Sequence, residues 1–198
     1  MNFSEGLEKI IEQTNGDSDG AFEGTAVKII KLPSTLKEIG RKTFYRCLEL
    51  EECILPQNLE KIGDRAFKGS GLISSDLPSS LEEIGNEAYA ETLIKKVKIG
   101  DKIKTLGNRA FGKCSNLKEV ILSPSLRQII NIENGKQKDV PITYIFDPEM
   151  LNKILEIVFE GCGRLDKLKI DLDGKMKEYS RRNSIMSVSN RAYEGEEI

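Results

Sequence analysis

Apolar residues recur along this chain with a period of 22 or 23 residues, which is much longer than the period of a helix or a strand. The clearest mark is an aromatic residue behind a small one, found at Phe22, Phe44, Phe67, Tyr89 and Phe111. Around each ring the chain reads Leu-Pro-x-x-Leu-x-x-Ile-Gly-x-x-Ala-Phe-x-x-Cys-x-x-Leu-x-x-Val-x-Leu. This period predicts a solenoid, because one coil of this size cannot bury its own apolar residues and must stack on the next coil.

Each coil is predicted to contain two short strands. The first follows the ring, with an apolar spacing that is clear in Leu50, Cys53 and Leu55; the coil 72–77 fits it with Ser75 in the middle. The second strand is shorter and has two apolar residues in each coil. We expect the rings of Phe44, Phe67, Tyr89 and Phe111 to stack as a column.

Proline and glycine mark the ends of these strands. Proline ends the first strand, where no backbone donor is required. Glycine follows the second strand, where we expect the turn to need a positive φ. The glycines at this position are Gly40, Gly63, Gly85 and Gly107.

The segment from Leu77 to Tyr89 reads Leu-Pro-Ser-Ser-Leu-Glu-Glu-Ile-Gly-Asn-Glu-Ala-Tyr and resembles the repeats of the Treponema pallidum type, or BspA-like, leucine-rich repeat family. The Ile-Gly-x-x-Ala-Phe part is the specific one, and the resemblance covers residues 21–130. It implies a leucine-rich repeat solenoid of right-handed, β-rich coils with a parallel concave sheet and short turn or helical segments. It also implies an adhesion or recognition protein of the cell surface, or a secreted one, without enzymatic activity.

The repeat pattern divides the chain into four parts. Residues 1–20 are expected to form an N-terminal cap, in which Leu7 and Ile10 resemble Leu59 and Ile62. Residues 21–130 hold the regular repeats. Residues 131–170 hold degenerate repeats with a loop and a short helix, and residues 171–198 hold a charged insertion and a partial terminal repeat.

The degenerate part leaves two alternatives open. The polar stretch from Asn131 to Asp139 replaces the corner of a coil, so this coil is bulged or carries a specialised loop. Phe159 lies 48 residues after Phe111, close to two periods. From Asp147 onward the pattern fits a helix, with Leu151, Ile154, Leu155 and Val158 on one face, but we favour a coil in which one turn is converted to helix.

The last part is predicted to begin with a solvated insertion, because the segment from Asp171 to Asn183 is rich in charge and poor in large apolar residues. A partial repeat then follows, with apolar residues at Ile185, Val188, Ala192 and Tyr193.

Charge and composition exclude several classes of partner. The 30 basic and 32 acidic residues give a net charge of -2, which argues against a nucleic-acid-binding surface. No apolar run approaches the roughly 18 residues of a membrane span, and the segment from Met1 to Ile11 does not read as a secretory signal. If Met1 is the native start, these features favour the cytoplasm, whereas the family resemblance favours the cell surface or secretion. We expect a monomer.

The residues that usually carry chemistry are scarce. The sequence has no histidine, which argues against an enzyme, and we predict neither a cofactor nor a metal site. Cys47, Cys114 and Cys162 follow the ring by three residues, where other coils have Ser70 and Thr92. If coils stack at about 4.8 Å, Cys47 and Cys114 are too far apart for a disulfide, so free buried thiols are expected.

Binding is predicted at the outward positions of the first strands, which face solvent on the concave sheet. The isoleucines at these positions are explained either by β-propensity alone or by an apolar contact patch bordered by charge. The lysines form a basic spot that suits an acidic partner protein or an anionic glycan. Charge compensation by acidic neighbours is the simpler explanation of these lysines. The predicted function is recognition of a partner protein, and the alternative is a structural spacer or stalk. The predicted contact residues are Ile29, Glu52, Ile54, Ile73, Lys95, Lys96, Lys98, Lys118 and Ile121.

Overall fold

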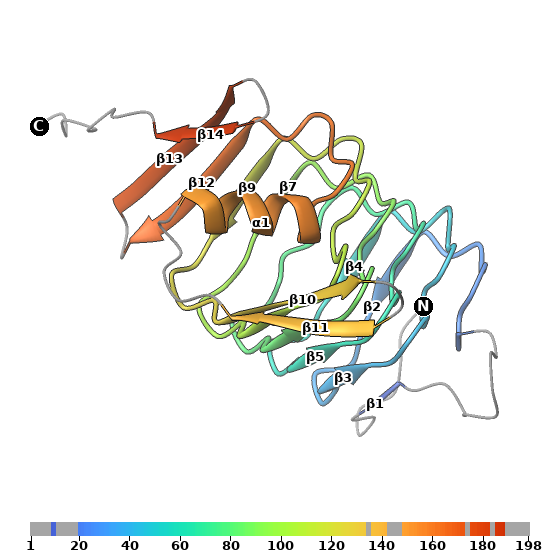
Figure 1. Ribbon diagram of the computed structural model, residues 1–198. Coiled ribbons are helices and arrows are strands. Elements are labelled where there is room, and N and C mark those ends of the chain that lie inside the picture. Colours follow the sequence, from blue (N-terminus) through green and yellow to red (C-terminus); the bar gives the residue numbers. More distant parts are fainter. Residues whose placement is uncertain are drawn as a thin grey trace, which may run out of the picture.

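The computed structural model describes residues 9–10, 20–133, 136–141, 148–172, 175–182 and 185–188. Within these residues the chain forms a β-solenoid whose coils follow one another in chain order along one axis (Figure 1). The apolar positions of the repeat all point inward and form one continuous core, from Ile30 in the first regular coil to Ile170 in the last. The predicted fold class is confirmed.

The second strands of the coils form a seven-stranded sheet with the order β1-β3-β5-β6-β8-β10-β11. Its parallel register places the buried Ile39 beside Ile62, and Ile62 beside Ile84. Ile10 pairs with Ile39, so Ile10 takes the repeat position that its resemblance to Ile62 predicts. The parallel members are β1 (Lys9–Ile10), β3 (Glu38–Ile39), β5 (Lys61–Ile62), β6 (Glu83–Ile84), β8 (Thr105–Leu106) and β10 (Gln128–Glu133).

The first strands form two separate sheets instead of one. In the first sheet β2 (Ile29–Lys31) pairs with β4 (Glu52–Ile54). In the second, β7 (Lys96–Lys98), β9 (Glu119–Leu122) and β12 (Lys167–Leu172) pair in parallel. The strand predicted for the coil 72–77 is absent, so the expectation of a continuous sheet is wrong at this coil.

The predicted column of rings is present and longer than expected. Adjacent rings lie 5.2 Å apart from Phe44 to Phe67, 5.0 Å from Phe67 to Tyr89 and 5.2 Å from Tyr89 to Phe111, with interplanar angles of at most 15°. Phe22 adds a ring at one end, and Phe159 adds one at the other, 5.6 Å from Phe111. The column therefore runs through the whole described solenoid.

Phe159 follows Phe111 by 48 residues and stacks directly on it, so this interval counts as one enlarged coil and not as two periods. The polar stretch from Asn131 to Asp139 belongs to an antiparallel hairpin of β10 and β11 (Lys136–Pro141). Helix α1 (Pro148–Val158) follows, with Leu151, Ile154 and Val158 fully buried. The helix spans 11 residues, and the residues that the sequence pattern placed on one helical face form its buried side. The backbone then rejoins the stack, where the Phe111 N–H donates to Val158 O at 3.1 Å.

The C-terminal part also differs from its prediction. The segment from Asp171 to Asn183, expected to be a solvated insertion, contains the end of β12 and strand β13 (Lys175–Arg182), in which Tyr179 is fully buried. Ile185 and Val188 of the predicted partial repeat lie in β14 (Ile185–Val188), which runs antiparallel to β13. Ala192 and Tyr193 lie outside the described residues. The amino-acid composition of this segment did not indicate a strand, because charged side chains can occupy the face of a sheet that is exposed to solvent.

The thiols bond between coils. Cys47 donates to Phe22 O at 2.9 Å, Cys114 to Tyr89 O at 3.1 Å and Cys162 to Phe111 O at 3.0 Å. All three are free and buried, as predicted. Each thiol satisfies a carbonyl of the preceding coil. Thr92 at the same position donates instead to Tyr89 O of its own coil at 2.9 Å, and Ser70 Oγ has no hydrogen-bond partner in the described structure.

The glycines after the second strands are required by packing and not by a positive φ. The positive φ falls two residues later, at Lys42, Arg65, Glu87 and Arg109. A Cβ on Gly107 would lie 2.3 Å from the carbonyl carbon of Gly85, closer than any real contact. The glycines therefore let the backbones of successive coils approach each other.

We expect Phe67→Ala to lower the free energy of unfolding by about 3–5 kcal/mol, because it removes a fully buried ring with a stacked neighbour on each side. Urea unfolding measures this change. Leu48→Ala is the control, since Leu48 is 75% exposed and its truncation should cost less than about 0.5 kcal/mol. Equal effects of the two substitutions would contradict a stabilising contribution of the ring column.

Gly107→Ala should lower the free energy of unfolding by about 1–3 kcal/mol, because its Cβ meets the backbone of the preceding coil. Gly100→Ala is the matched control, since a Cβ at Gly100 meets nothing within 4 Å. Thermal unfolding of both variants compares them, and a Gly107→Ala protein as stable as the control would refute the packing explanation.

Candidate functional site at a break in the strand face

The outer surface of residues 29–31, 52–54, 73–77, 95–98 and 118–122, which contains β2, β4, β7 and β9, is called the strand face below. Eight of the nine predicted contact residues are exposed on it, all except Ile121. The three exposed isoleucines are Ile29, Ile54 and Ile73, with 55%, 44% and 45% of their surface accessible. The strand face thus combines apolar side chains with charge.

Ile121 is only 7% exposed, so its prediction as an exposed contact residue is wrong. Its strand β9 lies between β7 and β12, with Lys98 and Lys169 directly beside Ile121 in the register. The Lys98 side chain reaches across β9 to Asp171, with Nζ 3.0 Å from Oδ2. This bridge and the lysine stems cover Ile121, which single-strand alternation does not reveal.

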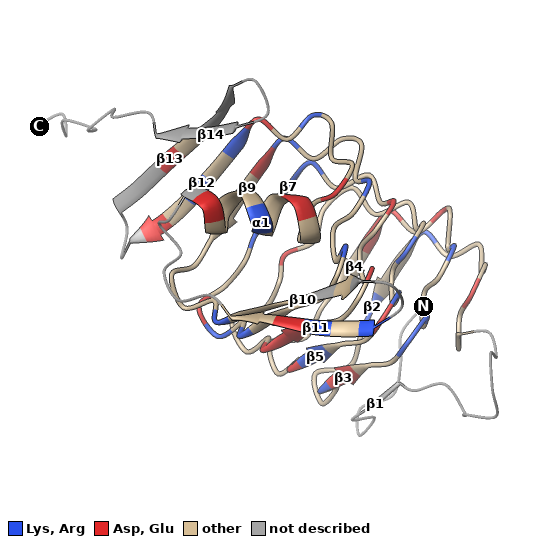
Figure 2. Ribbon diagram, viewed as in Figure 1, with Lys and Arg blue, Asp and Glu red and all other residues tan. Residues whose placement is uncertain are grey.

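Acidic neighbours hold two of the three clustered lysines. Lys96 lies 2.6 Å from Glu119, which also binds Lys169 at 2.8 Å, and Lys98 binds Asp171. Basic and acidic residues alternate from coil to coil over this region (Figure 2). Charge compensation is therefore confirmed for Lys96 and Lys98. The exposed Lys95 has no ion pair within the described residues.

A groove opens beside these lysines and is called the slot below. It has a volume of about 760 Å³ and lies between residues 73–79 and residues 95–102. Ile73, Lys95, Lys96 and Lys98, all predicted from the sequence, line it together with Asp76, Asp101 and Lys102. The two coils are joined by Leu93 N–H to Leu72 O and next by Lys104 N–H to Glu82 O. Between these bonds the described structure has no backbone hydrogen bond from one coil to the other.

The slot coincides with a polar pair in the core. Ser75 occupies the inward position that holds Ile30 or Val97 in other coils, and its hydroxyl donates to the Tyr89 hydroxyl at 3.1 Å. Tyr89 replaces the phenylalanine of the other coils, so its buried hydroxyl needs a partner. A serine gains little from burial, so residues 73–77 are not drawn into the sheet.

Three features of the sequence coincide at the slot. Tyr89 and Ser75 each break the apolar pattern of their own column. In addition, the two neighbouring corners are one residue short, since Leu72 follows Ser70 by two positions whereas Leu50 follows Cys47 by three. Sequence reasoning missed Lys102 and Asp101, which lie beyond the predicted strand.

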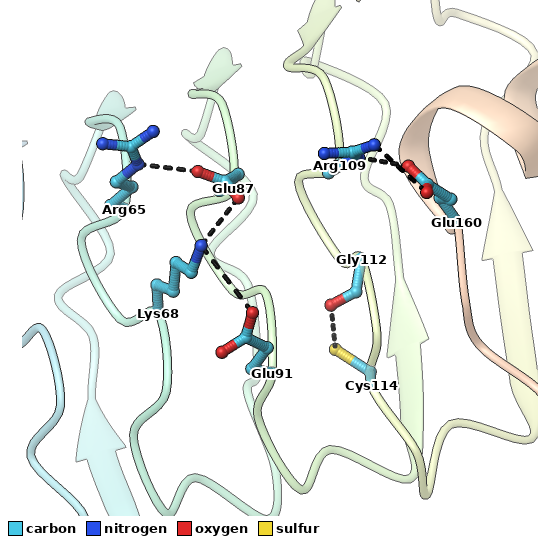
Figure 3. Close-up of polar contacts among 8 residues, drawn as sticks. All are labelled: Arg65, Lys68, Glu87, Glu91, Arg109, Gly112, Cys114 and Glu160. Carbon is cyan, nitrogen blue, oxygen red and sulfur yellow. Dashed lines mark hydrogen bonds and ion pairs between the residues drawn. The ribbon is translucent and has the colours of Figure 1, made fainter.

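A second groove, of about 490 Å³, lies at the ring corners beside α1. Arg65 binds Glu87 at 2.6 Å, Lys68 binds the same carboxylate at 2.7 Å, and Arg109 pairs with Glu160 (Figure 3). Burial raises the pKa of Glu87, but the hydrogen bonds from Lys68 and Arg65 outweigh this effect, and the net pKa lies below its ordinary value. These charges bind one another and hold adjacent coils together, so we interpret this groove as structural.

Other site chemistry is sparse in the described residues. No group of three His, Cys, Asp or Glu side chains is placed to hold a metal ion there. None of the helices in that part of the chain has the length and apolar character needed to cross a membrane.

The family model for the BspA type leucine rich repeat region matches six copies, over residues 17–134 and 82–193. The chain belongs to the BspA-type leucine-rich repeat family. The matches extend the family beyond the regular repeats that carry the resemblance in the sequence, and members are generally not enzymes.

Several solved leucine-rich repeat proteins share this BspA-type fold. A protein from Bacteroides ovatus is 27% identical with a TM-score of 0.56, over 84% of this chain and 41% of its own. The Treponema pallidum leucine-rich repeat protein is 24% identical with a TM-score of 0.60, over 82% of this chain and 62% of its own. A protein from Eubacterium ventriosum is 17% identical with a TM-score of 0.57, over 83% of this chain and 37% of its own. The chain therefore spans less than two thirds of each relative, and no curated protein matches it significantly.

Glu119 gives the BspA-type strand face a predicted pH dependence. Its hydrogen bonds with Lys169 and then Lys96 hold the pKa of Glu119 below its ordinary value. Folding therefore favours the ionised form, and the resulting stability is present above the ordinary glutamate pKa and lost as the pH falls through the lower folded value. Glu119→Gln should reduce the free energy of unfolding at neutral pH, and its difference from wild type should shrink as the pH falls below the ordinary glutamate pKa of about 4.3 and vanish below the lower folded pKa.

Urea unfolding at a series of pH values measures this difference. Glu51→Gln serves as the control, because Glu51 is exposed and makes no ion pair within the described residues. A Glu119→Gln deficit that stays constant down to pH 2 would show that the ion pairs do not carry the effect.

Proposed function

We propose that this chain is a non-catalytic recognition module that binds a partner protein through the strand face around the slot. The observation that carries the proposal is the grouping of Ile73 with Lys95 at the slot, where a 45% exposed isoleucine adjoins a lysine without an ion pair. Exposed apolar residues rimmed by charge are typical of protein interfaces.

Two features support binding over catalysis. The sequence has no histidine, and the carboxylate of Glu119 beside the clustered lysines is engaged by Lys96 and Lys169 in structural ion pairs. Both grooves are open surface features built from repeated coils, the type of surface that solenoids use to bind partners. An adhesin-like partner on another cell is the form of binding that the family resemblance favours, and an anionic glycan would meet the same lysines.

The structure refines the choice of variant for testing this proposal. Reversing the charge of Lys96 or Lys98 would leave Glu119 or Asp171 facing a like charge, so lost stability would confuse the result. Ile73→Asp with Lys95→Glu changes the same surface without breaking an ion pair. Lys37→Glu is the matched control, since Lys37 is exposed at the second-strand side of the solenoid.

We expect Ile73→Asp with Lys95→Glu to reduce partner binding by about tenfold or more, because a central apolar contact and a charge complement are both lost. A photo-crosslinker beside Ile73 identifies the partner in lysates, and titration with the purified partner measures affinity. The Lys37→Glu protein should bind like wild type. Unchanged binding of the double variant would instead favour the alternative, a spacer or stalk whose strand face has no partner.

A further inference from the structure

We propose that the slot binds an extended, acidic segment of a partner protein, which adds as a strand to the open edge of β7. This inference rests on the proposed function and specifies the chemistry of the partner. It makes backbone hydrogen bonds, and not only side-chain contacts, the basis of recognition.

The backbone around the slot is open on both sides. β7 is the last strand of the sheet β14-β13-β12-β9-β7, and β4 is the last strand of the sheet β2-β4. Both edges therefore point toward residues 73–77 inside the solenoid and not toward its ends. An edge strand presents unpaired N–H and C=O groups in a row, which an extended peptide can use.

The segment that should pair with these edges does not. Ile73 N–H donates to Glu51 O at 3.3 Å, but Ser74, Asp76 and Leu77 make no backbone hydrogen bond within the described structure, and Ser75 bonds there only through its side chain, to Tyr89. Elsewhere on the strand face consecutive coils are fully joined, for example through the Ile99 N–H and Ile121 O at 2.8 Å. The missing bonds are thus local to the slot, where a groove of about 760 Å³ separates the two coils.

Charge favours an acidic segment. The slot is lined by four lysines and two aspartates, which are Lys95, Lys96, Lys98, Lys102, Asp76 and Asp101. Glu119 and Asp171 already bind Lys96 and Lys98, but Lys95 and Lys102 are exposed and have no ion pair within the described residues. Carboxylates at alternate positions of an added strand would meet these ammonium groups on the outer face, beside Ile73, and the residues between them would point toward the interior of the slot.

A competing explanation gives the lysines a protective role. Lysine on a strand edge keeps other chains from pairing with it. That explanation predicts no binding of any extended peptide, so the experiment below separates the two.

The probe is the fluorescent peptide acetyl-Glu-Val-Glu-Val-Glu-Val-Glu-amide, titrated with the full chain at low and high salt. A version with lysine for glutamate tests the charge, and a version with alternate N-methylated amides keeps the charge but loses backbone donors. We expect the acidic peptide to bind, the basic one not to bind, and the N-methylated one to bind about tenfold more weakly or worse. Amide exchange should slow at residues 96–98 when the acidic peptide is present.

A closed variant tests the slot itself. Ser75→Val with Tyr89→Phe restores the apolar pattern of the other coils, so residues 73–77 should join the sheet and peptide binding should fall about tenfold or more. Slower exchange at residues 73–77 without peptide checks that the slot has closed. If this protein fails to fold, Lys95→Glu with Lys102→Glu provides the same test, and Lys37→Glu remains the control.

The outcomes are distinct. Equal binding of the acidic peptide and its N-methylated form, full binding by the closed variant, or no binding of the acidic peptide would each overturn strand addition. The proposed function has a separate test, since partner binding that depends on Ile73 and Lys95 but survives closure of the slot would leave recognition standing and remove only the added strand.

Discussion

Contact between successive coils is the constraint on which the rest of this structure depends. No coil can bury its own apolar residues, so the ring, the two short strands and the corner of each coil are covered by the next one. The rings lie 5.0–5.6 Å apart along the column, and the thiols of Cys114 and Cys162 beside them donate to carbonyls of the preceding coils. The glycines follow from the same constraint, because a Cβ on Gly107 would hold the coils apart. Even the enlarged coil obeys it, since the hairpin and helix between Phe111 and Phe159 leave the ring column unbroken.

A departure from the repeat produces the most distinctive surface of the molecule. Tyr89 is the one ring of the column that has a hydroxyl, and Ser75 forms a hydrogen bond with it. Because serine replaces an apolar residue at this position, little apolar burial holds residues 73–77 in the sheet. The strand face opens there, and the slot forms between two edges that would otherwise be paired. Departures from a consistent local pattern are expected at functional sites, where they are tolerated because the surrounding structure is stable. The intact coils on both sides provide that stability here.

Two of the three sheets change from parallel to antiparallel pairing at one edge within the described residues. One changes at β10 and β11, and the other at β12, β13 and β14. Antiparallel strands need no further coil to return the chain, so they widen the sheet without adding a coil to the stack. The exposed lysines of β11 also discourage pairing with another chain.

The sequence by itself determined the period, the fold, the ring column and the free thiols, because each regular coil repeats the same contacts with its neighbour. It also identified Ile73, Lys95, Lys96 and Lys98 as exposed, since alternation along a strand is a local property. Only the tertiary structure decided what depends on contacts between different coils. Ile121 is covered by a bridge from Lys98 to Asp171, which lie 73 residues apart. Phe159 joins the column directly after Phe111, and the slot opens because Ser75 meets Tyr89; in both cases the deciding partner comes from another part of the chain.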